Sequence, residues 1–303
     1  MDKPKATRMT SPTEPATQRN DGALKGVALV VAATFLFGLS DTVSKHLAML
    51  YAVPLLLAVR YGVNLLLLMA VMMPRHGTRL WRTSRLALVL LRGACLAAAS
   101  LSMVLALRVM PVGETVAIIY IAPFLVMLAA GPILGEKVSL IGWLAAASSF
   151  LGVLVIARPG SGLDPIGVGL CLLNAGCATV YHLLTRMLTR TETTMAMLFH
   201  TALVGTVVFA SFLPWSLGGA MPALFDAGLM VVLGVLGTVG HLLFTAAYRQ
   251  APASLLAPVN YLHIVWAAIL GWLVFAHVPD GLALIGMAMI MASGVAVAVL
   301  ARR

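Results

Sequence analysis

The sequence predicts an all-α integral membrane protein of ten transmembrane helices, arranged as two inverted five-helix repeats. Three observations support this prediction: the composition, the apolar runs, and a sequence register that recurs at one fixed interval. Of the 303 residues, 61% are hydrophobic and only 10% are charged, whereas soluble domains carry about 25% charged residues. Backbone groups cannot stay unpaired in lipid, so the apolar runs should be helices.

The apolar runs, bounded by turn or charged residues, define the expected helices. Pro54, Pro111 and Pro252 lie at or near helix starts, where a missing N–H group is tolerated. The linkers are short, so neighbouring helices should be antiparallel. The expected helices cover residues 24–44, 53–74, 86–107, 111–132, 139–157, 166–186, 195–213, 225–248, 252–275 and 281–301.

The segment before the first run is rich in Pro, Thr and charge. Such composition is typical of disorder, so we expect residues 1–22 to form a disordered cytoplasmic tail. The rest divides into two expected repeats, residues 23–158 and 159–303. The first apolar run is long enough to span a bilayer, so we expect it to be retained rather than cleaved as a signal peptide.

One stretch of sequence occurs twice. Pro111 and Tyr120 are each followed 141 residues later by the same residue type, at Pro252 and Tyr261. Similarity at a fixed interval indicates an internal repeat. Each repeat holds five expected helices, an odd number, so the second must enter the membrane from the opposite side. Inverted repeats of this kind are a recurring architecture of secondary transporters.

The net charge of +10 reports membrane topology, because the cations lie at the ends of apolar runs. With the amino terminus inside, 15 of the 20 Lys and Arg residues fall on the cytoplasmic side and three on the outer side. We therefore expect both termini to be cytoplasmic. The two remaining cations lie within helices: Arg60, expected to act as an interfacial anchor, and Arg92, which lies deeper.

Ionisable and amide side chains inside spanning helices are costly unless they face a partner or water, so each is a candidate for a substrate pathway. Interhelical hydrogen bonding is the alternative role. For Arg92 these alternatives are a substrate carboxylate and an internal partner, and for Tyr120 and Tyr261 they are a central cavity and simple packing. The candidate substrate-binding residues are Arg92, Tyr120, Asn174, Tyr181, His182, His241, Asn260, Tyr261, His263 and Trp266.

Asp41 and Lys45 lie four residues apart near the outer end of the first helix. They are the candidates for coupling or gating, and a local ion pair between them is the alternative. Asp41 is the only acidic residue well inside an expected span, so proton coupling would use Asp41 or a histidine. We expect facilitated diffusion down the substrate gradient.

No metal site or cofactor is expected. The three cysteines lie inside apolar runs, and the chain has no Cys-x-x-Cys or His-Glu-x-x-His pattern. Four intramembrane histidines leave an intramembrane enzyme as a competing hypothesis, but no acid pair or Ser/His pair accompanies them. A channel is disfavoured because no charged ring is visible. We therefore expect a protein that is not an enzyme and has no nucleic-acid partner.

Pro111-Val-Gly-Glu-Thr, together with Pro123 and Leu134-Gly-Glu, occupies the first copy of the repeated stretch. This pattern resembles the EamA unit of the drug/metabolite transporter superfamily, in which a five-helix unit is duplicated. The second copy departs from the pattern: Ala276-His277 replaces Gly135-Glu136, and Ile264 replaces Pro123.

Within that superfamily the whole chain resembles the bacterial YddG-type exporters of aromatic and other neutral amino acids. The resemblance implies an inner-membrane exporter, able to work as a monomer in membrane lipid, with alternating access around a midplane cavity. Export of drugs, quaternary amines or other metabolites is the alternative within the same fold. The shortage of buried acidic residues argues against a cationic substrate.

Overall fold

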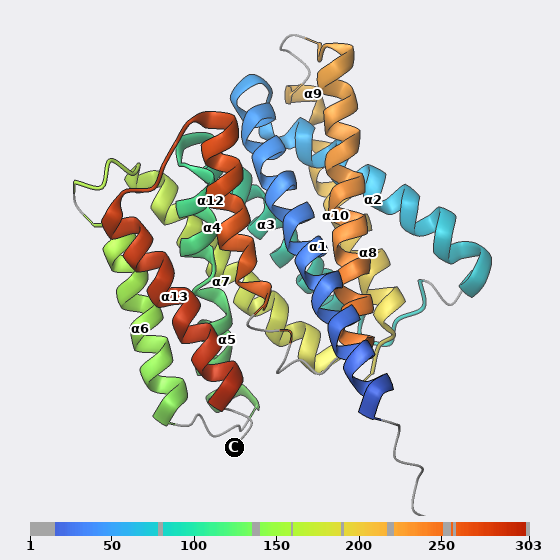
Figure 1. Cartoon of the computed structure of the whole chain (residues 1–303). Coiled ribbons are helices and arrows are strands. Elements are labelled where there is room, and N and C mark those ends of the chain that lie inside the picture. Colours follow the sequence, from blue (N-terminus) through green and yellow to red (C-terminus); the bar gives the residue numbers. More distant parts are fainter. Residues whose placement is uncertain are drawn as a thin grey trace, which may run out of the picture.

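The computed structural model describes residues 16–77, 81–134, 140–158, 160–188, 191–216, 221–250, 256 and 259–300. Within these ranges the chain is a bundle of helices without strands (Figure 1). The helices are α1 (Ala16–Leu50), α2 (Val53–His76), α3 (Leu86–Val109), α4 (Val112–Ile119), α5 (Ala122–Leu134), α6 (Leu140–Ile156), α7 (Pro165–Leu188), α8 (Thr194–Ser211), α9 (Leu213–Ser216), α10 (Leu224–Gln250), α12 (Leu262–Phe275) and α13 (Gly281–Leu300).

The described helices confirm the predicted fold class. Six are long and apolar enough to cross a membrane, and four shorter apolar helical segments correspond to the other four expected spans. α1 begins at Ala16, so residues 16–22 are helical and the predicted disordered tail is too long by that segment. Residues 1–15 lie outside the described ranges.

Helix packing follows the two-fold relation that an inverted repeat requires. When each helix is replaced by its mate in the other repeat, the packed pair of α1 with α10 becomes α7 with α3. In the same way, the pair of α2 with α10 becomes α8 with α3, and both of these pairs are also packed. Three further pairs each join a helix to its own repeat mate: α2 with α8, α4 with α12, and α6 with α13. The two units therefore share one intertwined interface.

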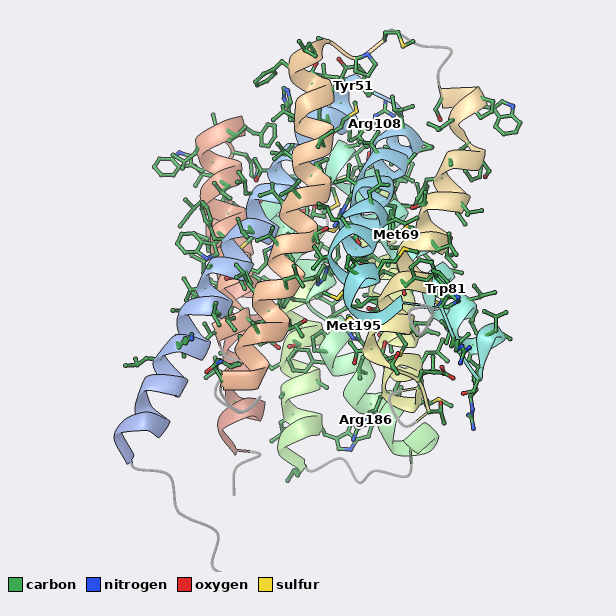
Figure 2. All side chains as sticks on the ribbon, turned by 90° about the vertical axis from the view of Figure 1, so that its right-hand side faces the viewer. Tyr51, Met69, Trp81, Arg108, Arg186 and Met195 are labelled. Atoms are coloured by element: carbon green, nitrogen blue, oxygen red, sulfur yellow. The ribbon has the colours of Figure 1, made fainter. Side chains whose placement is uncertain are left out.

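The apolar core is concentrated toward one end of the bundle. Figure 2 shows Arg108 near one end, called here the Arg108 end, and Arg186 near the other, the Arg186 end. One large cluster around α4 includes Leu107 and Ile264, and a second around α2 includes Leu57. Toward the Arg186 end, the described residues form three smaller and separate clusters.

α6 and α13 pack backbone to backbone at one edge of the bundle (Figure 1). A Cβ atom at Gly152 would lie 2.8 Å from the carbonyl oxygen of Gly286, and one at Gly286 would lie 2.6 Å from that of Gly152. Glycine at membrane helix interfaces permits such close approach, and helix association in lipid depends on the resulting van der Waals contact.

Replacing Gly286 by Val should force α6 and α13 apart, because a Cβ there meets the backbone carbonyl oxygen of Gly152 as well as the Ile156 side chain, each at 2.6 Å. Overpacking of this kind destabilises by roughly 1–3 kcal/mol. We expect a lower unfolding temperature for the purified protein in detergent. Gly228→Val is the matched control, since a Cβ at Gly228 on α10 meets nothing within 4 Å. An equal loss in both variants would contradict the close-packing argument.

Candidate functional site

Two helices are interrupted at the same position of the repeat. α4 ends at Ile119 and α5 begins at Ala122, so Tyr120 lies in a turn between them. Its repeat mate Tyr261 lies in a turn directly before α12. The prediction of continuous helices over 111–132 and 252–275 is wrong at these two points.

Pro123 accounts for the first interruption. Proline has no N–H group, and its ring crowds the carbonyl four residues earlier, which here belongs to Ile119, the last residue of α4. Ile264 stands at the corresponding place in the second copy, so proline does not explain the turn at Tyr261. Transporters with inverted repeats build binding sites at such discontinuous helices.

Five rings meet at these interruptions, and we call them the ring cluster: Phe37, Tyr120, His241, Tyr261 and His263. Tyr120 lies 5.3 Å from Tyr261 and 5.7 Å from His263, between ring centroids. Phe37 of α1 lies 6.0 Å from His263 and 5.0 Å from His241. The tilted and edge-on geometries are those that aromatic rings favour. The cluster therefore joins α1, α10 and both interrupted helices.

A chain of hydrogen bonds runs through the ring cluster. His263 Nε2 lies 2.9 Å from a carboxylate oxygen of the buried Asp41, and His263 Nδ1 lies 3.2 Å from the Tyr120 hydroxyl. Tyr120 also donates to the backbone carbonyl of Asn260, at 3.1 Å. The Tyr120 side chain at the first interruption thus supplies a hydrogen-bond donor to the Asn260 carbonyl, just before the second interruption at Tyr261.

The protonation state of His263 determines whether Tyr120 can form both of its hydrogen bonds, to His263 and to the Asn260 carbonyl, at the same time. In neutral His263 with Nε2–H donated to Asp41, Nδ1 is an acceptor, so the single Tyr120 hydrogen must serve either Nδ1 or the Asn260 carbonyl. In protonated His263, Nδ1–H donates to the Tyr120 oxygen, and Tyr120 donates to the Asn260 carbonyl without competition from Nδ1. Protonation therefore strengthens the link between the two interruptions.

The interior faces of α7 and α10 are covered toward the Arg108 end and open toward the Arg186 end. On α7, Ala175 is fully buried, whereas His182, two turns further along the same face, is exposed. On α10, Gly234 is buried, whereas His241, also two turns further along, is exposed. Both predicted histidines thus lie where the bundle interior becomes accessible.

Arg92 is held entirely by neighbouring helices. It is 3% exposed, and its donors reach the Thr185 hydroxyl at 2.6 Å, the Thr201 hydroxyl at 2.7 Å, the Tyr181 hydroxyl at 2.6 Å and the Met197 carbonyl at 3.1 Å. Four of its five N–H donors are therefore used within the protein. This geometry favours the internal role among the two predicted for Arg92, and Tyr181 shares it.

Two other predicted residues, Asn174 and Trp266, also lie outside the ring cluster. Asn174 donates to the Ala99 carbonyl at 2.6 Å and so ties α7 to α3. Trp266 packs edge-on against Phe35, with ring centroids 5.4 Å apart.

Lys45 does not pair locally with Asp41. Its Nζ donates to the carbonyls of Leu107 and Met110, at 2.8 and 2.7 Å, and so caps the end of α3. Asp41 is bonded to His263 instead. The local ion pair considered for these two residues is therefore replaced by two separate contacts with other helices.

Polar contacts join the two halves at the Arg108 end. The Asp280 carboxylate accepts hydrogen bonds from the backbone N–H of Ala283 and from the Arg158 guanidinium, and both lower its pKa. The ion pair of Asp280 with Arg158 is therefore present above that lowered pKa and is lost as the pH falls through it. The contacts are Tyr51 with Asp226 at 2.6 Å, Glu114 with His277 at 2.8 Å, and Arg158 with Asp280 at 2.6 Å.

Sequence reasoning missed two parts of the site. Phe37, an ordinary apolar residue by composition, is the ring that connects the two histidines of the cluster. A pocket with a cavity volume of about 70 Å³ lies beside the cluster. It is lined by Arg60, Tyr61, Asn64, Leu96, Ser100, Gly234, Gly237 and His241. Arg60, expected to be an anchor, thus lines an internal pocket.

Comparisons with known proteins agree with this architecture. The riboflavin transporter of Brucella anthropi is 31% identical over 212 residues, covering 68% of this chain and 74% of that protein. The pseudopaline exporter CntI of Pseudomonas aeruginosa is 27% identical over 272 residues, covering 89% and 95%. A solved crystal structure, 22% identical, covers 94% of this chain and 98% of that chain, with a TM-score of 0.62, and so shares the fold.

These relatives do not support the expected closeness to YddG-type amino acid exporters, but they do support a transporter of small molecules. The profile of the EamA-like transporter family matches residues 24–158 and again residues 165–299, one match in each half of the chain. The chain therefore belongs to the EamA-like transporter family, a group of multi-pass membrane transporters.

Proposed function

We propose that this protein is a carrier of the bacterial inner membrane that exports a small ring-bearing metabolite by alternating access, with the ring cluster as its substrate contact. The observation that carries the proposal is the position of the cluster. Its rings meet at two interrupted helices, next to the point where the interior faces of α7 and α10 become accessible. Aromatic surfaces of this kind suit planar, weakly polar ligands.

The charge distribution supports one orientation. The excess of Lys and Arg on the side of the Arg186 end favours a cytoplasmic location for that end and for both termini. In that orientation the described state opens toward the cytoplasm and is closed toward the outside. Release to the outside would then require the contacts at the Arg108 end, such as Glu114 with His277, to separate.

The substrate class proposed here is wider than amino acids. Aromatic amino acids fit as its smaller members, and the names of the relatives, which refer to riboflavin and pseudopaline, favour larger metabolites. Quaternary amines fit less well, because the acid at the cluster, Asp41, is already bonded to His263.

Removing a ring of the cluster should weaken substrate binding. Tyr120→Ala and His263→Ala are each expected to raise the KM for uptake into proteoliposomes roughly tenfold, since a lost ring contact with its buried area corresponds to about 1.4 kcal/mol or more. Tritiated riboflavin and phenylalanine are the substrates to compare. Trp215→Ala is the control, because Trp215 is 79% exposed on α9, away from the site. An unchanged KM in both cluster variants would sink the proposal.

A specific observation favours proton coupling over the facilitated diffusion expected from sequence. The part-buried pair of Asp41 and His263 links α1 to α12, and protonation of His263 completes the hydrogen bond to the Asn260 carbonyl. The other titratable groups next to the pair are Tyr120 and, across Phe37, His241. We propose that one proton bound at this pair accompanies each transport cycle.

Asp41→Asn separates these two mechanisms. The amide oxygen can still accept from His263, but the variant lacks the negative charge that stabilises protonated His263, so uptake driven by an imposed pH gradient should be lost. Substrate counterflow, which needs no net proton movement, should continue in the same vesicles. If the uptake rate of the wild type does not change with the size or the direction of the pH gradient, proton coupling is ruled out and facilitated diffusion remains.

A further inference from the structure

Arg60 differs from the other arginine inside a spanning helix. Arg92 uses four N–H donors within the protein, whereas Arg60 makes no hydrogen bond or ion pair with any described residue. Its guanidinium carries a positive charge. An unpaired charge inside a membrane protein is costly and marks a ligand or ion pathway unless it reaches the interface.

The local packing keeps this guanidinium inside the bundle. A Cβ atom at Gly237 of α10 would lie 3.8 Å from both Nε and Nη2 of Arg60, so the group lies against α10 where side-chain bulk is absent. Gly234, one turn earlier, lets α10 approach the Arg60 carbonyl, to which a Cβ would be 3.1 Å distant. Arg60 is therefore held between helices rather than extended along its stem to the membrane surface.

The pocket around Arg60 contains donors but no acid. None of its eight lining residues is Asp or Glu, so no lining side chain neutralises the guanidinium. Asn64, Ser100 and His241 supply further polar groups, and Ser100 is fixed by the Tyr61 hydroxyl at 2.7 Å. A planar guanidinium flanked by neutral donors matches a carboxylate or phosphate, which it can bind with two parallel hydrogen bonds.

The pocket also adjoins the ring cluster. His241 lines the pocket and stacks against Phe37, 5.0 Å away between centroids. A ligand whose ring lies on the cluster could therefore place a charged group beside Arg60 without crossing another helix.

We propose that Arg60, assisted by Asn64 and His241, binds an anionic group, a carboxylate or phosphate, on the transported metabolite. The identification of the ligand as the substrate rests on the proposed transport function, whereas anion binding at the pocket does not. A phospholipid headgroup offers the same chemistry, so the test separates a soluble anion from a lipid.

The first measurement uses inorganic phosphate as the probe. Thermal unfolding of the full-length protein in detergent is followed with phosphate and with chloride at equal ionic strength. Phosphate should raise the unfolding temperature of the wild type and have no such effect on Arg60→Gln. Arg60→Lys should respond partly, because it keeps the charge but loses the planar fork. Arg108→Gln, which removes an exposed arginine, is the matched control and should respond like the wild type.

The second measurement compares ligands that share a ring and differ in charge: flavin mononucleotide with riboflavin, and indole-3-acetate with indole-3-acetamide. Wild type and Arg108→Gln should bind the anionic member of each pair about tenfold more tightly. Arg60→Gln should bind both members equally, at the affinity of the neutral one. Equal wild-type affinity for both members, or an equal loss for both in Arg60→Gln, would overturn the proposal.

The remaining outcomes are also decisive. If the wild type binds none of the ring ligands but still responds to phosphate through Arg60, the anion site stands and the proposed substrate class fails. A third result is that the effect of phosphate and the affinity for ring anions are the same in the wild type and in Arg60→Gln. If phosphatidylglycerol in phosphatidylcholine vesicles then stabilises the wild type and not Arg60→Gln, the pocket binds lipid and the proposal is overturned.

Discussion

A helix cannot be interrupted inside lipid unless the backbone groups released by the interruption find partners, and this constraint organises the site. The two interruptions meet the requirement in part through each other. Tyr120, in the turn between α4 and α5, donates to the carbonyl of Asn260, next to the turn before α12. His263 then links Tyr120 to Asp41 on α1. One part-buried chain of hydrogen bonds therefore joins α1 and the turn between α4 and α5, from the first half, to α12 of the second half.

The polar groups of the interior divide into those that hold the bundle and those that remain available. Some polar side chains donate hydrogen bonds to neighbouring helices, as polar side chains in membranes commonly do; these are Arg92, Asn174 and Lys45. Arg60 has no such partner among the described residues and faces a pocket without acids. The same residue type, placed in two neighbouring helices of one repeat, thus serves cohesion in α3 and offers a binding group in α2.

Packing is unequal along the bundle, and this inequality is what an alternating-access carrier needs. The two large apolar clusters and the polar contacts between halves lie toward the Arg108 end, while the interior faces of α7 and α10 open toward the Arg186 end. Because the halves are related by an inverted two-fold, the exchange of their conformations would transfer the closed packing to the opposite end. The ring cluster, which contains repeat mates from both halves, remains near the centre of that exchange.

The sequence by itself determined the class of the protein, the helix count and the duplication, because apolar length and a constant register are properties of the chain alone. It also made Tyr120, Tyr261, His241 and His263 candidates for the site, because polar residues in spanning helices are costly and therefore few. Only the tertiary structure decided which of these meet. The sequence distinguished Arg92 from Arg60 only by depth in the membrane. Their surroundings differ because hydroxyl groups of α7 and α8 surround Arg92, while two glycines of α10 leave space beside Arg60. Phe37 entered the site for the same reason: contacts between distant segments depend on how helices pack, which periodicity within one helix does not encode.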